Sequence, residues 1–87
     1  MRLVVRGRVQ GVGFRWFVRE TARAAGLAGW VRNDVDGSVE LAAAGPVQAL
    51  SALRASVSHG PPGSRVTEVE ELPVGDDSLP FPFMVQR

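Results

Sequence analysis

The absence of cysteine places the strongest constraint on how this chain can fold. Its 87 residues are enough for one small domain, and without disulfides the packing of a single hydrophobic core has to hold that domain together. No apolar run approaches the roughly 18 residues of a membrane span, and the N-terminus has no signal-peptide core. We therefore expect one cytoplasmic domain over residues 1–87, not bound to a membrane.

Other missing residue types exclude several kinds of chemistry. Without cysteine there is no thiolate nucleophile, and most zinc sites are excluded as well. All ten basic residues are arginine, which rules out a P-loop lysine, a Schiff-base lysine and a Ser–Lys pair. His59 is the only histidine and cannot build a multi-histidine metal site. We expect neither a metal nor another cofactor.

Positive charge is concentrated near the N-terminus. Residues 1–32 hold seven of the ten arginines and one of the nine acidic residues, although the whole chain has a net charge of +1. Such an asymmetry favours an anionic partner. The alternative is that the arginines form a solvated surface and bind nothing.

The first half of the chain has strand, helix and strand periodicities. Residues 2–9 alternate, with Leu3, Val5, Gly7 and Val9 on the inner face, which predicts a half-buried strand. Glycines within residues 10–13 end it, and a helical pattern runs from Phe14 to a natural stop at Gly26. Residues 28–33 and 38–44 are predicted to be strands joined by a tight turn at Asp36-Gly37.

The second half repeats the helix and strand order. Gly45-Pro46 opens a predicted helix, after which residues 59–63 form a loop and residues 65–72 a strand. The expected apolar stripe of this helix consists of Val47, Leu50, Leu53 and Val57. In the strand, Val66 and Val69 fall on opposite faces, which leaves its register open.

A short terminal strand completes the predicted fold. Phe81, Phe83 and Val85 alternate, and Pro82 places this strand at the edge of the sheet. The whole order predicts an α+β, ferredoxin-like βαββαβ sandwich with an additional edge strand. Two helices would cover one face of a mostly antiparallel sheet, and the other face would be solvated.

The segment Gly-Arg-Val-Gln-Gly-Val-Gly-Phe-Arg at 7–15 is a glycine-rich turn between a strand and a helix. Successive backbone N–H groups in such a turn can converge on one oxyanion, and the helix dipole adds positive potential. Arg15 falls in the first helical turn, where its planar guanidinium can hold two oxygens of a phosphoryl group. The alternative is a tight connection with a solvated arginine.

A second segment, residues 29–37, places an asparagine at the end of a strand. The amide of Asn33 can donate to a phosphate oxygen and accept from a water at the same time. Asn33 could instead cap the turn. We interpret Trp30, in the same segment, as a packing residue.

Together, residues 7–15 and 29–45 resemble the two signatures of the acylphosphatase family, and the resemblance spans essentially the whole chain. The matching positions are Gly7, Val9, Gln10, Gly11, Val12, Phe14 and Arg15, followed by Gly29, Trp30, Val31, Asn33, Gly37, Val39 and Gly45. One departure is the segment Pro80-Phe81-Pro82 with the non-aromatic end Arg87, which concerns the last strand.

The resemblance implies hydrolysis of acyl phosphates to a carboxylate and inorganic phosphate. It implies that Arg15 binds the phosphoryl group and Asn33 orients the attacking water. The remaining expected substrate contacts form a backbone cradle of Gln10, Gly11, Val12, Gly13 and Phe14. Inorganic phosphate and sulfate would compete as anions. Candidate substrates are acetyl phosphate, carbamoyl phosphate and 1,3-bisphosphoglycerate, and the choice among them stays open.

Acyl phosphate chemistry needs little catalytic equipment. Phosphoryl transfer is largely positioning and electrostatic stabilisation, and the leaving carboxylate has a conjugate acid with a pKa of about 4. No general acid is needed at neutral pH. We expect in-line attack of water without a metal or a covalent intermediate; the phosphate or substrate could accept the proton.

Three other functions are suggested by parts of the sequence. Residues 34–38 resemble an aspartyl-phosphatase or calcium-loop motif, but they read as a hairpin turn. A module that binds or transfers carbamoyl phosphate is a second possibility, although such proteins continue into zinc-finger motifs. RNA-recognition domains share this fold and display aromatic side chains on their central strands. Here the outward residues of the first strand are Arg2, Val4, Arg6 and Arg8, which provide no aromatic platform. We expect a monomer that binds no nucleic acid.

Overall fold

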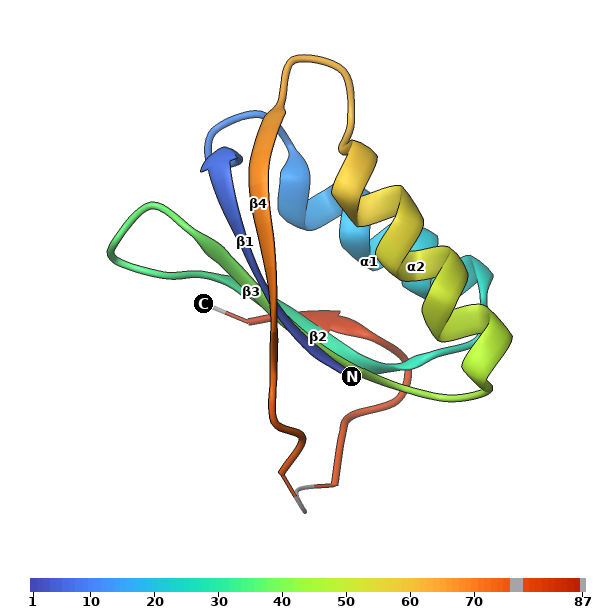
Figure 1. Cartoon of the computed structure of the whole chain (residues 1–87). Helices are drawn as coiled ribbons and strands as arrows, with labels where there is room; N and C mark the ends of the chain where they lie inside the picture. The colour runs from blue at the N-terminus through green and yellow to red at the C-terminus, as the bar shows by residue number, and fades with distance from the viewer. Residues whose placement is uncertain (76–77, 87) are drawn as a thin grey trace.

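The structure is a computed structural model that describes residues 1–75 and 78–86. Its elements are β1 (Arg2–Arg8), α1 (Phe14–Ala24), β2 (Ala28–Asn33), β3 (Val39–Ala44), α2 (Val47–His59), β4 (Arg65–Leu72) and β5 (Met84–Val85). The sheet has the order β4-β1-β3-β2-β5, and both helices lie on one of its faces (Figure 1). The pairing of β5 with β2 is parallel and the other three pairings are antiparallel. The predicted α+β, ferredoxin-like fold is confirmed.

The core lies between the helices and the sheet. The inward positions of β1 and β3 alternate as the sequence predicts, so that Leu3, Val5 and Leu41 are fully buried. Val18 and Ala22 of α1 and Val57 of α2 belong to the same buried cluster. Burying each such large side chain contributes roughly 1.5–3 kcal/mol, which is how a domain without disulfides is held together.

A β-bulge resolves the register that the sequence left open in β4. Along the β1–β4 pairing, Arg6 lies opposite Glu68 but Gly7 lies opposite Val66, which leaves Thr67 without a partner of its own. The extra residue brings Val66 and Val69 to the same face, where both pack against the core. Gly7, which was expected to face inward, lies opposite Val66 and is exposed.

Two details of the α2 prediction are wrong. Val47, assigned to the apolar stripe, is 78% exposed. At 100° per residue it lies about 120° around the helix axis from the buried Leu53. Ala49 takes its place against the core. The helix also continues to His59, which was expected to begin the loop and is exposed at the helix end.

The terminal strand is shorter than predicted. Only Met84–Val85 pair with β2, and Pro82 lies before the strand rather than inside it. Phe83 is fully buried, whereas Phe81 is 71% exposed, so the expected alternation holds for only part of the segment. Arg87 lies outside the described residues.

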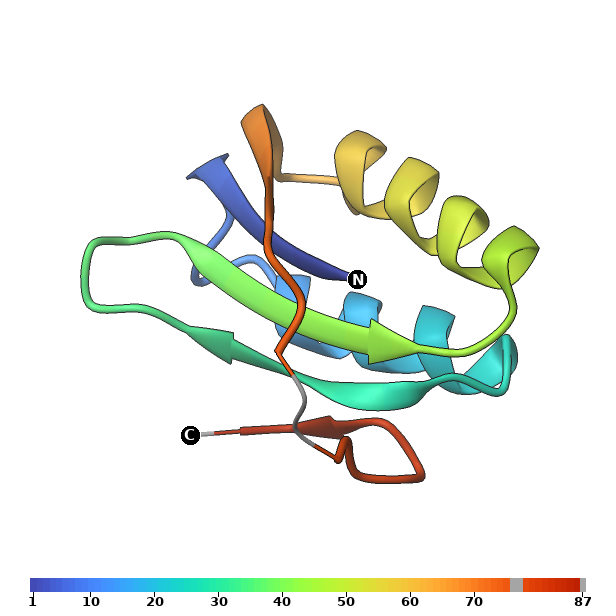
Figure 2. The same cartoon turned by 60° about the horizontal axis from the view of Figure 1, so that its bottom comes forward.

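The sheet face opposite the helices is more covered than predicted. Val74 and Leu79, from the described residues between β4 and β5, border a small cavity there together with Trp30, and residues 73–75 run in front of the sheet in Figure 2. Trp30 packs beneath the Arg32 guanidinium, whose carbon lies 4.8 Å from the ring centroid. Trp30 therefore has the packing role expected of it.

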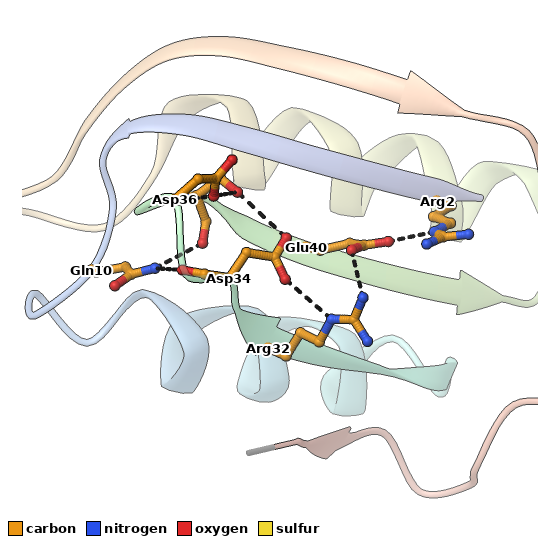
Figure 3. A network of polar contacts seen from close by, with 7 residues as sticks. Arg2, Gln10, Arg32, Asp34, Asp36 and Glu40 are labelled. Atoms are coloured by element: carbon orange, nitrogen blue, oxygen red, sulfur yellow. Dashed lines mark hydrogen bonds and ion pairs between the residues drawn. The ribbon is translucent and has the colours of Figure 1, made fainter.

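On that face, several arginines of the positively charged N-terminal part form ion pairs with acidic residues of the second half. The nearly buried Glu40 carboxylate accepts hydrogen bonds from both Arg2 and Arg32 (Figure 3). Arg6 pairs with glutamates of β4. Burial lowers the pKa of Arg32, but hydrogen bonding and attraction to Glu40 outweigh it and raise the pKa above its ordinary value. Several N-terminal arginines thus bind acids of the second half rather than an external anion.

Candidate active site

A cavity of about 720 Å³ opens where the loop after β1 enters α1 and where β2 ends. Its lining residues are Val9, Gly11, Gly13, Phe14, Arg15, Trp16, Arg19, Asn33 and Val85. Asn33 reaches it because strand alternation puts it on the same face as Val31, the face that α1 covers. The fold thus brings Arg15 and Asn33, from separate sequence motifs, to the wall of one cavity.

Two glycines shape the loop that borders this cavity. Gly11 and Gly13 have φ angles of +74° and +76°, whereas no described residue other than glycine has a positive φ. The sign of φ therefore alternates through residues 10–14, a conformation that turns successive N–H groups toward a common anion. A Cβ atom added to either glycine would meet no atom within 4 Å. Glycine is needed here for the backbone conformation, and both positions face open space.

The start of α1 adds positive potential to the same place. The helix begins at Phe14, and its first backbone bond runs from the Phe17 N–H to the Gly13 carbonyl at 3.0 Å. The N–H groups before Phe17 have no partner within the helix. Gly13 offers no side-chain cap, and no acidic residue stands in the first turn. Those N–H groups and the helix dipole can therefore act on a bound anion.

Arg15 and Asn33 are not engaged elsewhere in the described part of the chain. Five arginines form ion pairs with acids there, and Arg15 is not among them. The side chain of Asn33 makes no hydrogen bond to a described group, so it does not cap the turn as the alternative interpretation required. Asp36 performs that task, accepting from the Ser38 hydroxyl at 2.5 Å and the Ser38 N–H at 3.0 Å. These hydrogen bonds hold the pKa of Asp36 below its ordinary value.

Gln10 has a structural role that the sequence did not indicate. Its Nε2 donates to the carbonyl oxygens of Asp34 and Ser38 at 2.8 and 2.9 Å (Figure 3). The side chain thereby ties the loop before α1 to the hairpin that follows Asn33. Neither Gln10 nor Val12 lines the cavity, and Val12 packs against the core. Any contact of these two residues with substrate is therefore predicted to come from the main chain.

Sequence reasoning also missed three residues in the cavity wall. Trp16 and Arg19 come from α1, and Val85 comes from β5. Arg19 was open to prediction, because it follows Arg15 by four residues and shares its helix face. No sequence pattern places Val85 there, since the position depends on the parallel pairing of β5 with β2.

Comparison with known proteins decides the family. The family model described as Acylphosphatase matches residues 1–79. The chain belongs to the acylphosphatase family. It is therefore an enzyme that hydrolyses the carboxyl–phosphate bond of acyl phosphates.

Individual acylphosphatases support the assignment. The chain is 58% identical over 69 residues to an acylphosphatase of Koribacter versatilis, which covers 79% of this chain and 63% of that protein. It is 52% identical over 68 residues to the Bacillus subtilis acylphosphatase, which covers 78% of this chain and 75% of that protein.

Solved structures show the same architecture. A crystal structure of acylphosphatase from Bacillus subtilis superposes with a TM-score of 0.85 at 40% identity, covering 99% of this chain and 96% of that one. The crystal structure of T. kodakarensis HypF gives a TM-score of 0.85 at 28% identity, but the match covers 12% of that longer chain. The acylphosphatase fold is thus similar to one portion of a larger protein as well.

Gln10→Ala is expected to impair both stability and activity of this acylphosphatase. Two carbonyl oxygens of the hairpin each lose one of their two donors and keep the backbone one. The loss of two hydrogen bonds should lower the free energy of unfolding by roughly 1–3 kcal/mol. Because the loop and Asn33 are no longer held together, kcat/KM should fall about tenfold or more. Urea unfolding and a kinetic assay measure the two effects. Gln48→Ala, at an exposed position of α2, is the matched control and should leave both quantities unchanged. Equal stability and equal kcat/KM of the two variants would contradict the proposed role of Gln10 in holding the loop to the hairpin.

Proposed function

We propose that this enzyme hydrolyses acyl phosphates by direct in-line attack of water on phosphorus, at the cavity between β1, α1 and β2. Main-chain N–H groups of residues 10–14 and the Arg15 guanidinium hold the phosphoryl oxygens. Asn33 orients the water. The observation that supports this most is that Arg15, Asn33 and both left-handed glycines line one cavity.

The positive groups suit the charge that develops in the reaction. The phosphoryl oxygens carry negative charge throughout a loose transition state, and preorganised donors stabilise it most where water is displaced. Arg15 supplies two parallel N–H donors, which a lysine could not. The carbonyl oxygen of the Asn33 amide accepts a hydrogen bond from the water, and its NH₂ group donates to a phosphoryl oxygen.

The proposed step balances without further groups. A bond forms from the water oxygen to phosphorus, while the bond from phosphorus to the acyl oxygen breaks. The acyl oxygen keeps the electron pair and leaves as a carboxylate, whose conjugate acid has a pKa of about 4, so no general acid is required. The proton of the water passes to a phosphate oxygen, because an amide is not a useful base. An alkyl phosphate ester has a far more basic leaving group and should not be cleaved.

The direct test is phosphate release from benzoyl phosphate. We expect turnover that is unchanged by EDTA, and competitive inhibition by inorganic phosphate and by sulfate. An alkyl phosphate of similar size serves as the control substrate and should stay intact. Loss of activity in EDTA would indicate a metal mechanism, and non-competitive inhibition would contradict binding of phosphate in the cradle.

We also propose that the enzyme acts as a cytoplasmic monomer and binds no nucleic acid. The absence of cysteine fits a reducing compartment, and the site draws its residues from one chain. Within residues 1–75 and 78–86, no helix is long and apolar enough to cross a membrane. Analytical ultracentrifugation at micromolar concentration should give the mass of a single chain. Binding to RNA that grows steeply as salt is lowered would contradict the last point.

A further inference from the structure

The cavity is much larger than the reacting group requires. It measures about 720 Å³, within the range of roughly 300–1,000 Å³ that holds drug-sized ligands, whereas one water occupies about 30 Å³. Gly11, Gly13, Arg15 and Asn33 account for the part of the wall proposed to bind phosphate and water. The wall that remains includes Trp16 and Arg19, and it has to face the acyl part of the substrate.

Trp16 and Arg19 form one unit on α1. The Arg19 guanidinium carbon lies 4.6 Å from the centroid of the Trp16 ring, a cation–π geometry. Trp16 is 61% exposed although it is among the largest apolar side chains of the protein. Stacking on the ring restricts the guanidinium before any ligand arrives, which lowers the entropy cost of a further contact.

Arg19 is also placed at a defined distance from the phosphate site. It follows Arg15 by four residues, so both lie on the same helix face with Cβ atoms about 5–6 Å apart. Both arginines line the cavity, and no acidic residue of the described chain does. The Arg15 guanidinium is sufficient to bind the phosphoryl group, so the positive charge of Arg19 is available for a second anionic group.

The ion pair that Arg19 already forms would not prevent it from binding an anionic group of a substrate. Arg19 pairs with the adjacent Glu20 at 2.9 Å, and the Glu20 side chain is 50% exposed. An exposed pair of this kind is weak and screened by salt. The guanidinium has five N–H donors, so it can bind a second anion without leaving Glu20 or the ring.

We propose that Trp16 and Arg19 form an acyl-group subsite that selects acyl phosphates carrying a second anionic group, a carboxylate or phosphate about one helical turn from the phosphoryl group. Trp16 contacts the acyl chain or ring, and Arg19 binds the second anion. This inference rests on the proposed phosphate site at Arg15 and names the substrate class that the same cavity prefers.

The test compares benzoyl phosphate with 3-carboxybenzoyl phosphate, which differ by one carboxylate. The quantity measured is the ratio of their kcat/KM values. The wild type should prefer the carboxylated substrate about tenfold or more, as expected of a hydrogen-bonded ion pair. Arg19→Gln should remove that preference, and Arg19→Lys should restore part of it. Arg54→Gln on α2 removes the same charge away from the cavity and should keep the wild-type ratio.

Trp16→Leu provides an independent variant. It removes the platform under the guanidinium, and the ratio should fall between those of the wild type and Arg19→Gln. A wild type without the preference, or an Arg19→Gln variant that keeps it, would overturn the subsite while the hydrolysis of benzoyl phosphate still supports the phosphate site. If the wild type hydrolyses neither compound, both proposals are wrong. Circular dichroism checks that each variant is folded.

Discussion

Replacing Arg15 with alanine should lower kcat/KM for benzoyl phosphate about a thousandfold or more and abolish inhibition by inorganic phosphate. The expectation follows from its place in the cavity wall, beside the cradle and without an acidic partner in the described part of the chain. Loss of one such cationic donor to a transferring phosphoryl group costs about 10³–10⁵ in rate. Because no described ion pair depends on Arg15, the fold should survive the change.

Two further variants separate charge from geometry at this position. Arg15→Lys keeps the positive charge but loses the planar pair of donors, and it should recover only a small part of the lost activity. Arg54→Ala removes an arginine on α2 and should leave the kinetics unchanged. For each variant, steady-state kinetics give kcat/KM for benzoyl phosphate, and inhibition assays give the inhibition constant for phosphate. An Arg15→Ala variant with a near wild-type inhibition constant for phosphate would place the anion elsewhere.

Asn33→Ala should reduce kcat about a hundredfold while changing the inhibition constant for phosphate only a few-fold. A residue that orients the attacking water acts in the transition state, whereas the bound anion is held mainly by the cradle and Arg15. Activity measured against benzoyl phosphate, together with phosphate inhibition, separates the two quantities.

The matched control for Asn33 lies in the same hairpin. Val35 is fully exposed two residues later, so Val35→Ala perturbs the turn without touching the cavity. It should behave as the wild type. If Asn33→Ala weakened phosphate inhibition as strongly as it lowered kcat, the residue would bind the anion rather than position the water.

The strands and helices could be predicted where a single face of each is buried. Leu3, Val5 and Leu41 follow the two-residue period because each strand packs one face on the helices. The prediction failed at Val47, which is apolar but lies about 120° around the helix axis from the buried Leu53 and therefore faces away from the core. It also could not assign Val66 and Val69 to one face, because the extra residue at Thr67 is visible only in the pairing with β1.

The site could be predicted in part, because its chemistry lies in two short motifs. The glycine turn, Arg15 and Asn33 were identified from their residue types and their positions at element ends. The role of the Gln10 side chain could not be identified, since its acceptors are carbonyl oxygens, which every residue has. Val85 enters the wall through long-range strand pairing that no local pattern encodes.

The hydrogen bonds of Gln10 restrict how the length of the β2–β3 hairpin can vary. Surface loops ordinarily tolerate insertions, because nothing depends on their span. Here one side chain donates to carbonyl oxygens at both ends of the turn, those of Asp34 and Ser38. The Asp34 N–H also donates to the Ser38 carbonyl oxygen at 2.9 Å, which closes the turn. A residue added between them would separate the two acceptors, and the change would reach the catalytic cavity through the loop it supports. Deletions and insertions at this tip should therefore be rarer than its exposure suggests.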